Sequence, residues 1–260
     1  MHLLEHLKDI HKINNMLLTA NNLCKSVRGR KIVNNVSLYI NQGEIVGLLG
    51  ANGAGKTTTF NMLVGLLKCD EGDIFLENID ITKDQLWSRA QKGIGYLPQQ
   101  SSIFKDLTVE DNIKLSLELK KNITKTQIEE RTNELLEEFE ITHVKKTYGK
   151  SLSGGERRRV EIARLLTIDP KFLLLDEPFA GVDPKAISGL QNIIITLKSK
   201  YHYGILITDH NVDETLTITD RSYLMNNGEI LKHGSTEELI NDENVKKTYL
   251  GENFTLKTTF

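Results

Sequence analysis

The stretch Gly50-Ala51-Asn52-Gly53-Ala54-Gly55-Lys56-Thr57 decides the fold of this chain. It matches the pattern G-x-x-x-x-G-K-[ST], in which glycines let successive backbone N–H groups turn inward on the phosphates of a nucleotide. The lysine of this pattern, here Lys56, reaches the terminal phosphates, and the hydroxyl of Thr57 can bind Mg²⁺. We therefore expect this stretch, together with the neighbouring Thr58, to bind a nucleotide.

Apolar runs on both sides of the motif predict the strand and the helix that it needs. Ile45–Leu49 predicts a buried strand that leads into the loop. A helix is expected from about Gly55, and its apolar side would carry Phe60, Leu63, Val64 and Leu67. Further apolar runs predict strands at residues 36–40, 74–76, 94–97, 172–175, 204–207 and 223–225, and the last three alternate with helices. This pattern indicates an α/β fold with a mostly parallel sheet.

The composition limits the class of protein. The chain has 260 residues, of which 39% are hydrophobic and 26% charged, with a formal net charge of −2. This length holds one large domain or two small ones, and the near-neutral charge gives no reason to expect nucleic acid as a partner. Since no apolar run approaches the ~18–20 residues that span a bilayer, any membrane role would come through a partner. Cys24 and Cys69 lie in no metal-binding or redox motif, which predicts free thiols.

The character of the sequence changes between Thr108 and about Tyr148. Thr108 precedes two acidic residues, which favours it as the N-cap of a helix. The segment 124–140 is rich in Glu and Lys and carries its apolar residues on one side. We predict a helical lobe at about residues 100–165, inserted in the core lobe of a domain that spans 16–240. Residues 1–15 show no signal-peptide pattern and are expected to be disordered, and residues 241–260 are expected to form a tail that can contact a second copy.

Two acidic residues follow another buried strand. Phe172-Leu173-Leu174-Leu175 runs directly into Asp176 and Glu177. A buried strand would hold Asp176 rigidly where it can orient Mg²⁺, and Glu177 could then polarise the attacking water. Such a pair can also be an ordinary surface feature at a strand end, but the phosphate-binding loop makes that interpretation weak. Together the two motifs predict ATP hydrolysis.

Four further motifs resemble those of ABC-type ATPases. Leu152-Ser153-Gly154-Gly155-Glu156 matches the signature of that family, and Gln99, His210 and Asp183 match its Q-loop, switch and D-loop residues. The resemblance covers nearly all of residues 16–234. It implies that Gln99 contacts Mg²⁺ or the attacking water, that His210 contacts the γ-phosphate, and that Asp183 lies at a dimer interface. It also implies an ABC-type fold in which an antiparallel β-subdomain and a helical lobe accompany the sheet.

One phosphate-binding loop and one signature in each chain imply a homodimer. In ABC-type ATPases the signature covers the γ-phosphate of a nucleotide that another copy of the domain holds. The first turn of the helix after Ser153 presents backbone N–H donors and the positive end of the helix dipole to an anion. ATP would then lie between the Lys56 loop of one subunit and the Ser153 helix of the other.

Several longer sequence segments are similar to the ATPase subunits of lipopolysaccharide export complexes. These are Ser151–Arg164, Asp176–Pro184, Thr208–Asn211 and Val245–Phe254, with Gly95–Gln99 followed by Ser102-Ile103-Phe104. The resemblance implies an ATPase that powers extraction of lipopolysaccharide from the inner membrane toward the outer membrane. It would lie on the cytoplasmic face of the inner membrane, beneath two integral membrane permease subunits, and the complex rather than this chain would handle the lipid. Phe104, with Lys105 and Leu107, would line the groove that receives those subunits.

Two departures and two alternatives accompany this interpretation. Val27 stands where the family usually stacks an aromatic residue on adenine, which predicts somewhat weaker nucleotide binding, and Ala51 replaces a usual proline, with little effect expected. One alternative is the ATPase of a branched-chain amino-acid importer, against which the Phe179–Asp183 stretch and the Arg-rich run after the signature argue. The other is an ABC-type ATPase without a transport role, such as one of iron–sulfur assembly, against which the phrase around Phe104 argues.

Overall fold

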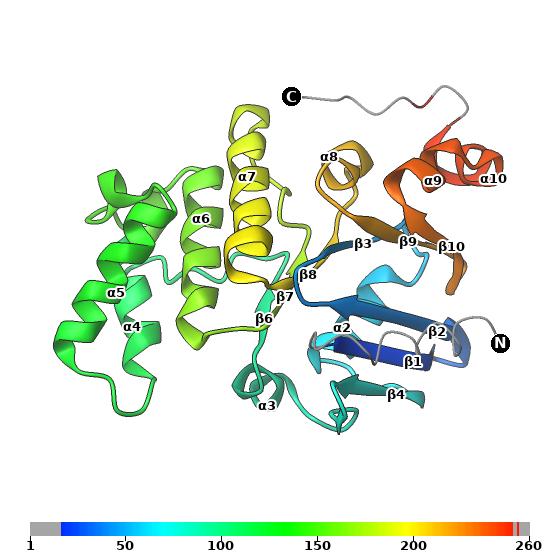
Figure 1. The fold of residues 1–260 in the computed structure, drawn as a ribbon, viewed down its shortest axis with the longest axis horizontal. Helices are drawn as coiled ribbons and strands as arrows, with labels where there is room; N and C mark the ends of the chain where they lie inside the picture. The colour runs from blue at the N-terminus through cyan, green and yellow to red at the C-terminus, as the bar shows by residue number, and fades with distance from the viewer. Residues whose placement is uncertain (1–16, 252–253, 255–260) are drawn as a thin grey trace.

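The strands of the computed structural model, which describes residues 17–251 and Phe254, form two sheets (Figure 1). The antiparallel sheet has the order β2-β1-β4-β5, and the six-stranded sheet has the order β10-β9-β3-β8-β7-β6. The bounds are β1 Leu17–Val27, β2 Arg30–Asn41, β3 Ile45–Gly50, β4 Glu71–Leu76, β5 Ile79–Asp80, β6 Ile94–Leu97, β7 Phe172–Asp176, β8 Gly204–Thr208, β9 Arg221–Asn226 and β10 Glu229–Ser235. The predicted extension at residues 1–15 lies outside the described residues.

The six-stranded sheet is parallel except at one edge. β3 pairs in parallel with β8 and β9, β7 pairs in parallel with β6 and β8, and only the β9–β10 pair is antiparallel. Since parallel strands end at the same edge of a sheet, Gly50, Asp176 and Thr208 meet at the carboxyl ends of β3, β7 and β8. Ligands of open α/β sheets bind at such an edge. The predicted fold class, a mostly parallel core with an antiparallel β-subdomain and helices, is confirmed.

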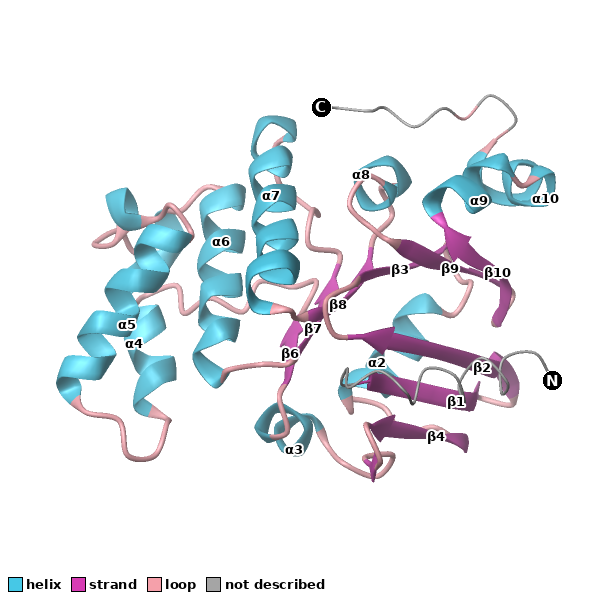
Figure 2. Ribbon diagram, viewed as in Figure 1, coloured by secondary structure: helices cyan, strands magenta, loops and turns pink. Residues whose placement is uncertain are grey.

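The helices lie around these sheets (Figure 2). Their bounds are α2 Lys56–Val64, α3 Leu86–Gln91, α4 Val109–Glu118, α5 Lys125–Glu138, α6 Gly154–Leu165, α7 Pro184–Tyr201, α8 Val212–Leu216, α9 Thr236–Asn241 and α10 Glu243–Val245. Short 3₁₀ turns occupy Thr142–Val144, Gly149–Ser151 and Leu166–Ile168, and a π-helical turn occupies Lys246–Leu250. No helix among the described residues is both long and apolar enough to cross a membrane.

Helix α2 begins where the sequence predicted and ends earlier. Gly55 precedes its first residue with a φ of 100°, and Gly65 follows its last residue with a φ of 85°. Both angles lie in the left-handed region, which glycine adopts without a steric penalty and which commonly ends a helix. Phe60, Leu63 and Val64 are buried on α2 as expected, but the placement of Leu67 on this helix was wrong because Gly65 ends it.

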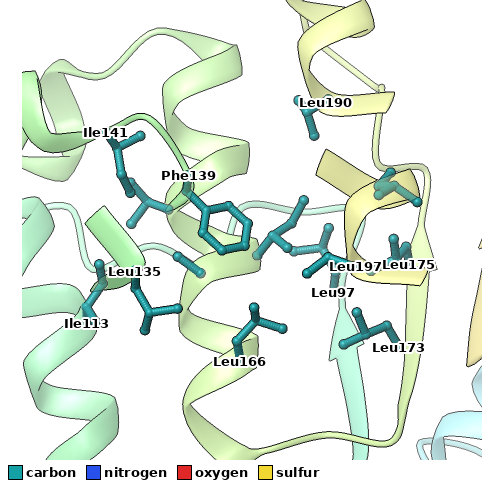
Figure 3. Packing of buried hydrophobic residues seen from close by; sticks show 14 of the residues in the cluster. Leu97, Ile113, Leu135, Phe139, Ile141, Leu166, Leu173, Leu175, Leu190 and Leu197 are labelled. Atoms are coloured by element: carbon teal, nitrogen blue, oxygen red, sulfur yellow. The ribbon is translucent and has the colours of Figure 1, made fainter. Parts of the chain in front are cut away.

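The three helices α4, α5 and α6 form a group at the left of Figure 1. The Thr108 side chain accepts a hydrogen bond from the backbone N–H of Asp111, so Thr108 is the N-cap of α4 as predicted. The buried side of α5 carries Ile128, Leu135 and Leu136, also as predicted. Figure 3 shows Leu135 and Phe139 in one apolar cluster with residues of the sheet strands β6 and β7. Val160 and Ile162 of α6 belong to the same cluster, so this shared core fixes α6 against the sheet.

Candidate active site

The phosphate-binding loop lines a cavity of about 480 Å³ at the carboxyl end of β3. Its walls are Arg30, Lys31, Ile32, Asn52, Gly53, Ala54, Gly55, Lys56, Thr57, Thr58, His210 and Asn227. Gly53 and Gly55 have φ angles of 79° and 100°, where L side chains are strained. A Cβ on Gly55 would also come within 2.8 Å of the carbonyl oxygen of Ile32. The loop therefore needs its glycines, as expected for a chain that wraps around phosphates.

Lys56 is buried at the bottom of this loop. Its ammonium group donates to the carbonyl oxygens of Gly50, at 2.5 Å, and Ala51, at 3.1 Å. Burial lowers the pKa of Lys56, and the carboxylates of Glu177, Asp176 and Asp209 act in the opposite direction. These three acids and one base thus share a single electrostatic environment at the end of the sheet.

Asp176 and Asp209 follow the strands β7 and β8. Asp176 accepts a hydrogen bond of 2.5 Å from the hydroxyl of Thr208, and Asp209 accepts one of 2.8 Å from the backbone N–H of Asn211. Burial is the main cause that raises the pKa of both carboxyl groups. Asp176 lies where the sequence predicted. Asp209 was missed, and its place between the strand residue Thr208 and His210 was the available signal.

Glu177 lies between two of the predicted residues. The Gln99 side chain donates through Nε2 to Glu177 Oε2 at 2.7 Å, and His210 Nε2 lies 2.6 Å from Glu177 Oε1. The backbone of Glu177 has a φ of 47°, in a region sparsely populated by residues other than glycine. The structure therefore brings together Gln99, Glu177 and His210, which lie far apart in the sequence, and holds both carboxylate oxygens of Glu177.

The burial of Asp176 gives a prediction for stability against pH. Because its pKa is raised on folding, the folded chain binds this proton more tightly than the unfolded chain does. The side chain of Asp176 therefore contributes least to the stability of the folded chain at pH values above its folded pKa, where it is charged. Asn at this position keeps the oxygen that accepts from Thr208. We expect Asp176→Asn to raise the thermal unfolding midpoint of the nucleotide-free chain at about pH 8, with a gain that shrinks toward about pH 4.

Thermal unfolding in a pH series measures this effect. The exposed Asp73, changed to Asn, is the matched control and should leave the midpoint nearly unchanged at every pH. A lower midpoint for Asp176→Asn at pH about 8 would contradict the assignment of a burial penalty to this carboxylate.

The signature residues lie apart from the cavity of the same chain. Among the described residues that line this cavity, none belongs to Leu152–Glu156. Ser153 is the exposed N-cap of α6, and its backbone N–H and hydroxyl donate to Glu156 Oε2 at 2.9 and 2.7 Å. Leu152 and Gly155 are buried, and a Cβ on Gly155 would lie 2.9 Å from Cβ of Ala186. Asp183 is the exposed N-cap of α7 and accepts from the backbone N–H groups of Lys185 and Ala186 at 3.1 Å.

The segment after Gln99 presents an aromatic side chain to solvent. Phe104 is 46% exposed, and the guanidinium of Arg164 lies 4.6 Å from the centre of its ring. Lys105 is exposed and Leu107 is half-buried. The buried Asn112 side chain accepts from the backbone N–H of Phe104 and donates to its carbonyl, at 2.9 and 3.0 Å. The backbone of this segment is therefore held in place by α4 of the helical lobe, and the Phe104 ring is partly exposed beside the Arg164 guanidinium.

Sequence reasoning did not find every wall of the cavity. Arg30, Lys31 and Asn227 line it. The turn Arg28-Gly29-Arg30 was the available signal for the first two, and Asn227 comes from the distant turn between β9 and β10. Val27 is 46% exposed and is not among the described residues that line the cavity. The consequence of Val27 for nucleotide affinity stays a prediction.

The available donors fit Mg²⁺. The exposed Thr57 side chain lines the cavity, and the Asp176 carboxyl group ends strand β7, which β8 separates from β3. Among residues 17–251 and Phe254, no group of three or more His, Cys, Asp or Glu side chains could hold a metal by itself. Mg²⁺ differs from most protein-bound metals in this respect, since it usually takes one or two protein ligands together with phosphate oxygens and water.

The fold and this site define a P-loop ATPase with a helical lobe, and the comparisons give its family. The ABC transporter family model matches residues 33–180. The chain belongs to the ABC transporter ATP-binding family, and it is an ATPase. The ADP-bound ATP-binding cassette of an ABC transporter superposes with a TM-score of 0.78 at 31% identity, over 91% of this chain and 99% of the other. A nucleotide-free cassette gives a TM-score of 0.80 at 30% identity, over 91% and 100%.

Curated relatives narrow the similarity within this family. The lipopolysaccharide export system ATP-binding protein LptB of Haemophilus influenzae is 54% identical over 240 residues, covering 92% of this chain and 99% of that protein. The protein of the same name from Escherichia coli K12 is 53% identical over 239 residues, with the same coverage. An uncharacterised ABC transporter ATP-binding protein of Rhizobium meliloti is 51% identical over 240 residues.

Proposed function

We propose that this chain is the ATP-hydrolysing subunit that powers extraction of lipopolysaccharide from the inner membrane for export toward the outer membrane. The observation that carries this proposal is the identity of 53–54%, over nearly the whole chain, to proteins named for lipopolysaccharide export. The retained site supports it, because Glu177 lies between Gln99 and His210 beside the phosphate-binding loop. The ATPase domain would span residues 16–240, with a helical lobe at about 100–165.

In the proposed mechanism, the residues around the cavity divide the work of phosphoryl transfer. The loop from Gly50 to Thr58 binds the phosphates, and Lys56 turns from the loop carbonyls to the terminal phosphates. Thr57, Gln99 and Asp176 would hold Mg²⁺, which neutralises charge on the phosphate oxygens when bound. Glu177 accepts a proton from the attacking water, and His210 orients Glu177 and contacts the γ-phosphate.

The proposed working unit contains two copies of the chain. Ser153 is exposed at the N-terminus of α6 and lies outside the cavity of the same chain, and through this helix end Leu152–Glu156 would meet a nucleotide bound by another copy. Asp183 would lie at the same interface. A related cassette has been solved as a dimer at 26% identity, with a TM-score of 0.75 and 84% of this chain covered. The tail at 241–260, of which residues 252–253 and 255–260 lie outside the described residues, would add a dimer contact.

The proposed location is the cytoplasmic face of the inner membrane, beneath two permease subunits. Phe104, Lys105 and Leu107 would form the coupling surface that receives them, because an exposed aromatic ring on a fixed segment is a typical interface anchor. The chain itself would contact neither nucleic acid nor the lipid cargo.

The coupling surface gives a prediction for Phe104. We expect Phe104→Ala to weaken assembly with the membrane subunits at least about tenfold, since a central aromatic anchor contributes about 2 kcal/mol or more. ATP affinity of the isolated chain should change by less than about twofold, because the ring lies outside the cavity. Ile195→Ala, at an exposed apolar position on α7, is the control. Equal assembly of both variants would rule out Phe104 as an anchor.

Co-purification from native membranes tests the proposed function. Tagged Glu177→Gln protein, with ATP present, should retain the closed dimer and recover two different membrane subunits with bound lipopolysaccharide. The tagged exposed variant Glu137→Gln is the matched control for the substitution. Recovery of amino-acid permease subunits would favour an importer, and a purely soluble assembly would exclude both transport functions.

A further inference from the structure

Three charged side chains of α6 hold the segment that contains Gln99. Arg158, Glu161 and Arg164 are spaced three residues apart and so share one side of the helix. Arg158 Nη1 donates to the Pro98 carbonyl at 2.9 Å. Glu161 Oε1 accepts from Ser101 Oγ and from the Ser102 backbone N–H, at 2.7 Å each. Arg164 Nη1 donates to the Ser102 carbonyl at 2.7 Å. Gln99 is therefore anchored on both sides to the helix that begins at the signature.

Glu161 is the central and most buried member of this set. Its side chain is 1% exposed, and its second oxygen, Oε2, lies 3.0 Å from Arg158 Nη1. A buried carboxylate is costly unless every lone pair finds a partner, and an apolar residue would fill the same space without that cost. The negative charge of Glu161 is thus compensated by the hydrogen-bond donors of the Gln99 segment and by the guanidinium of Arg158.

The same arginine also reaches the backbone around the catalytic carboxylate. Arg158 Nη2 donates to the Glu177 carbonyl at 2.8 Å, and its Nε donates to the Pro178 carbonyl at 3.1 Å. Glu161 therefore connects two groups that must act together: the segment that carries Gln99 and the turn that holds Glu177. The Gln99–Glu177 hydrogen bond of 2.7 Å lies between these anchored points.

We propose that Glu161 is a positioning residue for ATP hydrolysis. It ties the segment from Pro98 to Ser102 to α6 and so keeps Gln99 in contact with Glu177. The inference rests on the roles proposed above for Gln99 and Glu177, and it holds for any cargo.

Two variants separate this role from a general effect on folding. Glu161→Gln removes the charge, whereas Ser101→Ala removes one hydrogen bond at an exposed residue and leaves the buried pair with Arg158 intact. We expect Glu161→Gln to lower kcat of the full chain about tenfold with KM for ATP changed less than about twofold, and Ser101→Ala to lower kcat about threefold. The two effects on kcat should not multiply in the double variant, because both changes weaken the same link between α6 and the Gln99 segment. Ser199→Ala is the control at an exposed serine.

Hydrogen exchange at the Ser102 amide completes the test. Faster exchange together with the lower kcat supports the proposal. Faster exchange with unchanged kcat, or single effects on kcat that multiply in the double variant, overturns it. Should Glu161→Gln fail to fold, Ser101→Ala decides alone. Glu177→Gln in the same assay tests the underlying roles separately, since a loss there without a loss in the folded Glu161 and Ser101 variants overturns only the present inference.

Discussion

We expect Glu177→Gln to bind ATP normally and to hydrolyse it at least about 10²-fold more slowly than the unchanged chain, because a positioned general base contributes about 10²–10⁴-fold. The Gln99 amide already donates to one Glu177 oxygen, and His210 contacts the other. A glutamine at this position has the same shape, so it keeps the cavity intact while it loses the ability to accept a proton. Phosphate release under single-turnover conditions, with ATP binding measured in parallel, gives both values.

The exposed Glu137→Gln on α5 is the matched control and should hydrolyse ATP normally. Hydrolysis by Glu177→Gln within about tenfold of the unchanged chain would mean that another group activates the water. His210 would then be the first candidate, since its ring lies against the same carboxylate and lines the cavity.

The second large effect concerns the two halves of the proposed composite site. We expect Lys56→Ala to weaken ATP binding by about 10–100-fold, because a hydrogen bond to a charged group contributes about 1.5–3 kcal/mol, and to reduce hydrolysis below detection. The loss also leaves Asp176, Glu177 and Asp209 without the nearby cation that they share. Ser153→Arg should also abolish hydrolysis but retain ATP binding, since Ser153 lies outside the cavity of its own chain.

Mixing these two inactive proteins tests whether the site is shared between copies. A mixed dimer would contain one complete site, formed by the Lys56 loop of the Ser153→Arg chain and the signature of the Lys56→Ala chain. Partial recovery of hydrolysis on mixing is the expected result. Full activity of Ser153→Arg alone would contradict the composite site, and Ser199→Arg, at an exposed position of α7, is the control for a bulky cation.

The parts of the fold with a simple apolar pattern were predictable. The runs before Gly50 and before Asp176 are buried strands, since a strand covered on both faces reads as a continuous apolar stretch. Strand β1, which lies between β2 and β4, gave a weaker signal. Register shifts interrupt its pairing with β2, and Asn22 adopts a φ of 51°, so alternation fails along its length.

The geometry of the site needed the folded chain. Motifs, and not apolar periodicity, identified Gln99, Glu177 and His210. No local sequence pattern could give the distances between these three residues, because they follow three different strands. The Arg-rich run after the signature likewise did not indicate which charges are buried. Arg158 and Glu161 are buried, whereas Arg157 and Arg159 are only partly buried. This difference depends on which side of α6 faces the sheet.

Reconstitution with lipopolysaccharide tests the central claim most directly. The chain would be assembled with its two membrane subunits in liposomes that contain labelled lipopolysaccharide, and loss of the label from the bilayer would be followed after ATP is added. We predict that the unchanged chain drives ATP-dependent removal of lipopolysaccharide and that Glu177→Gln does not. ATP hydrolysis that the membrane subunits stimulate, with no lipopolysaccharide leaving the bilayer, would contradict the account.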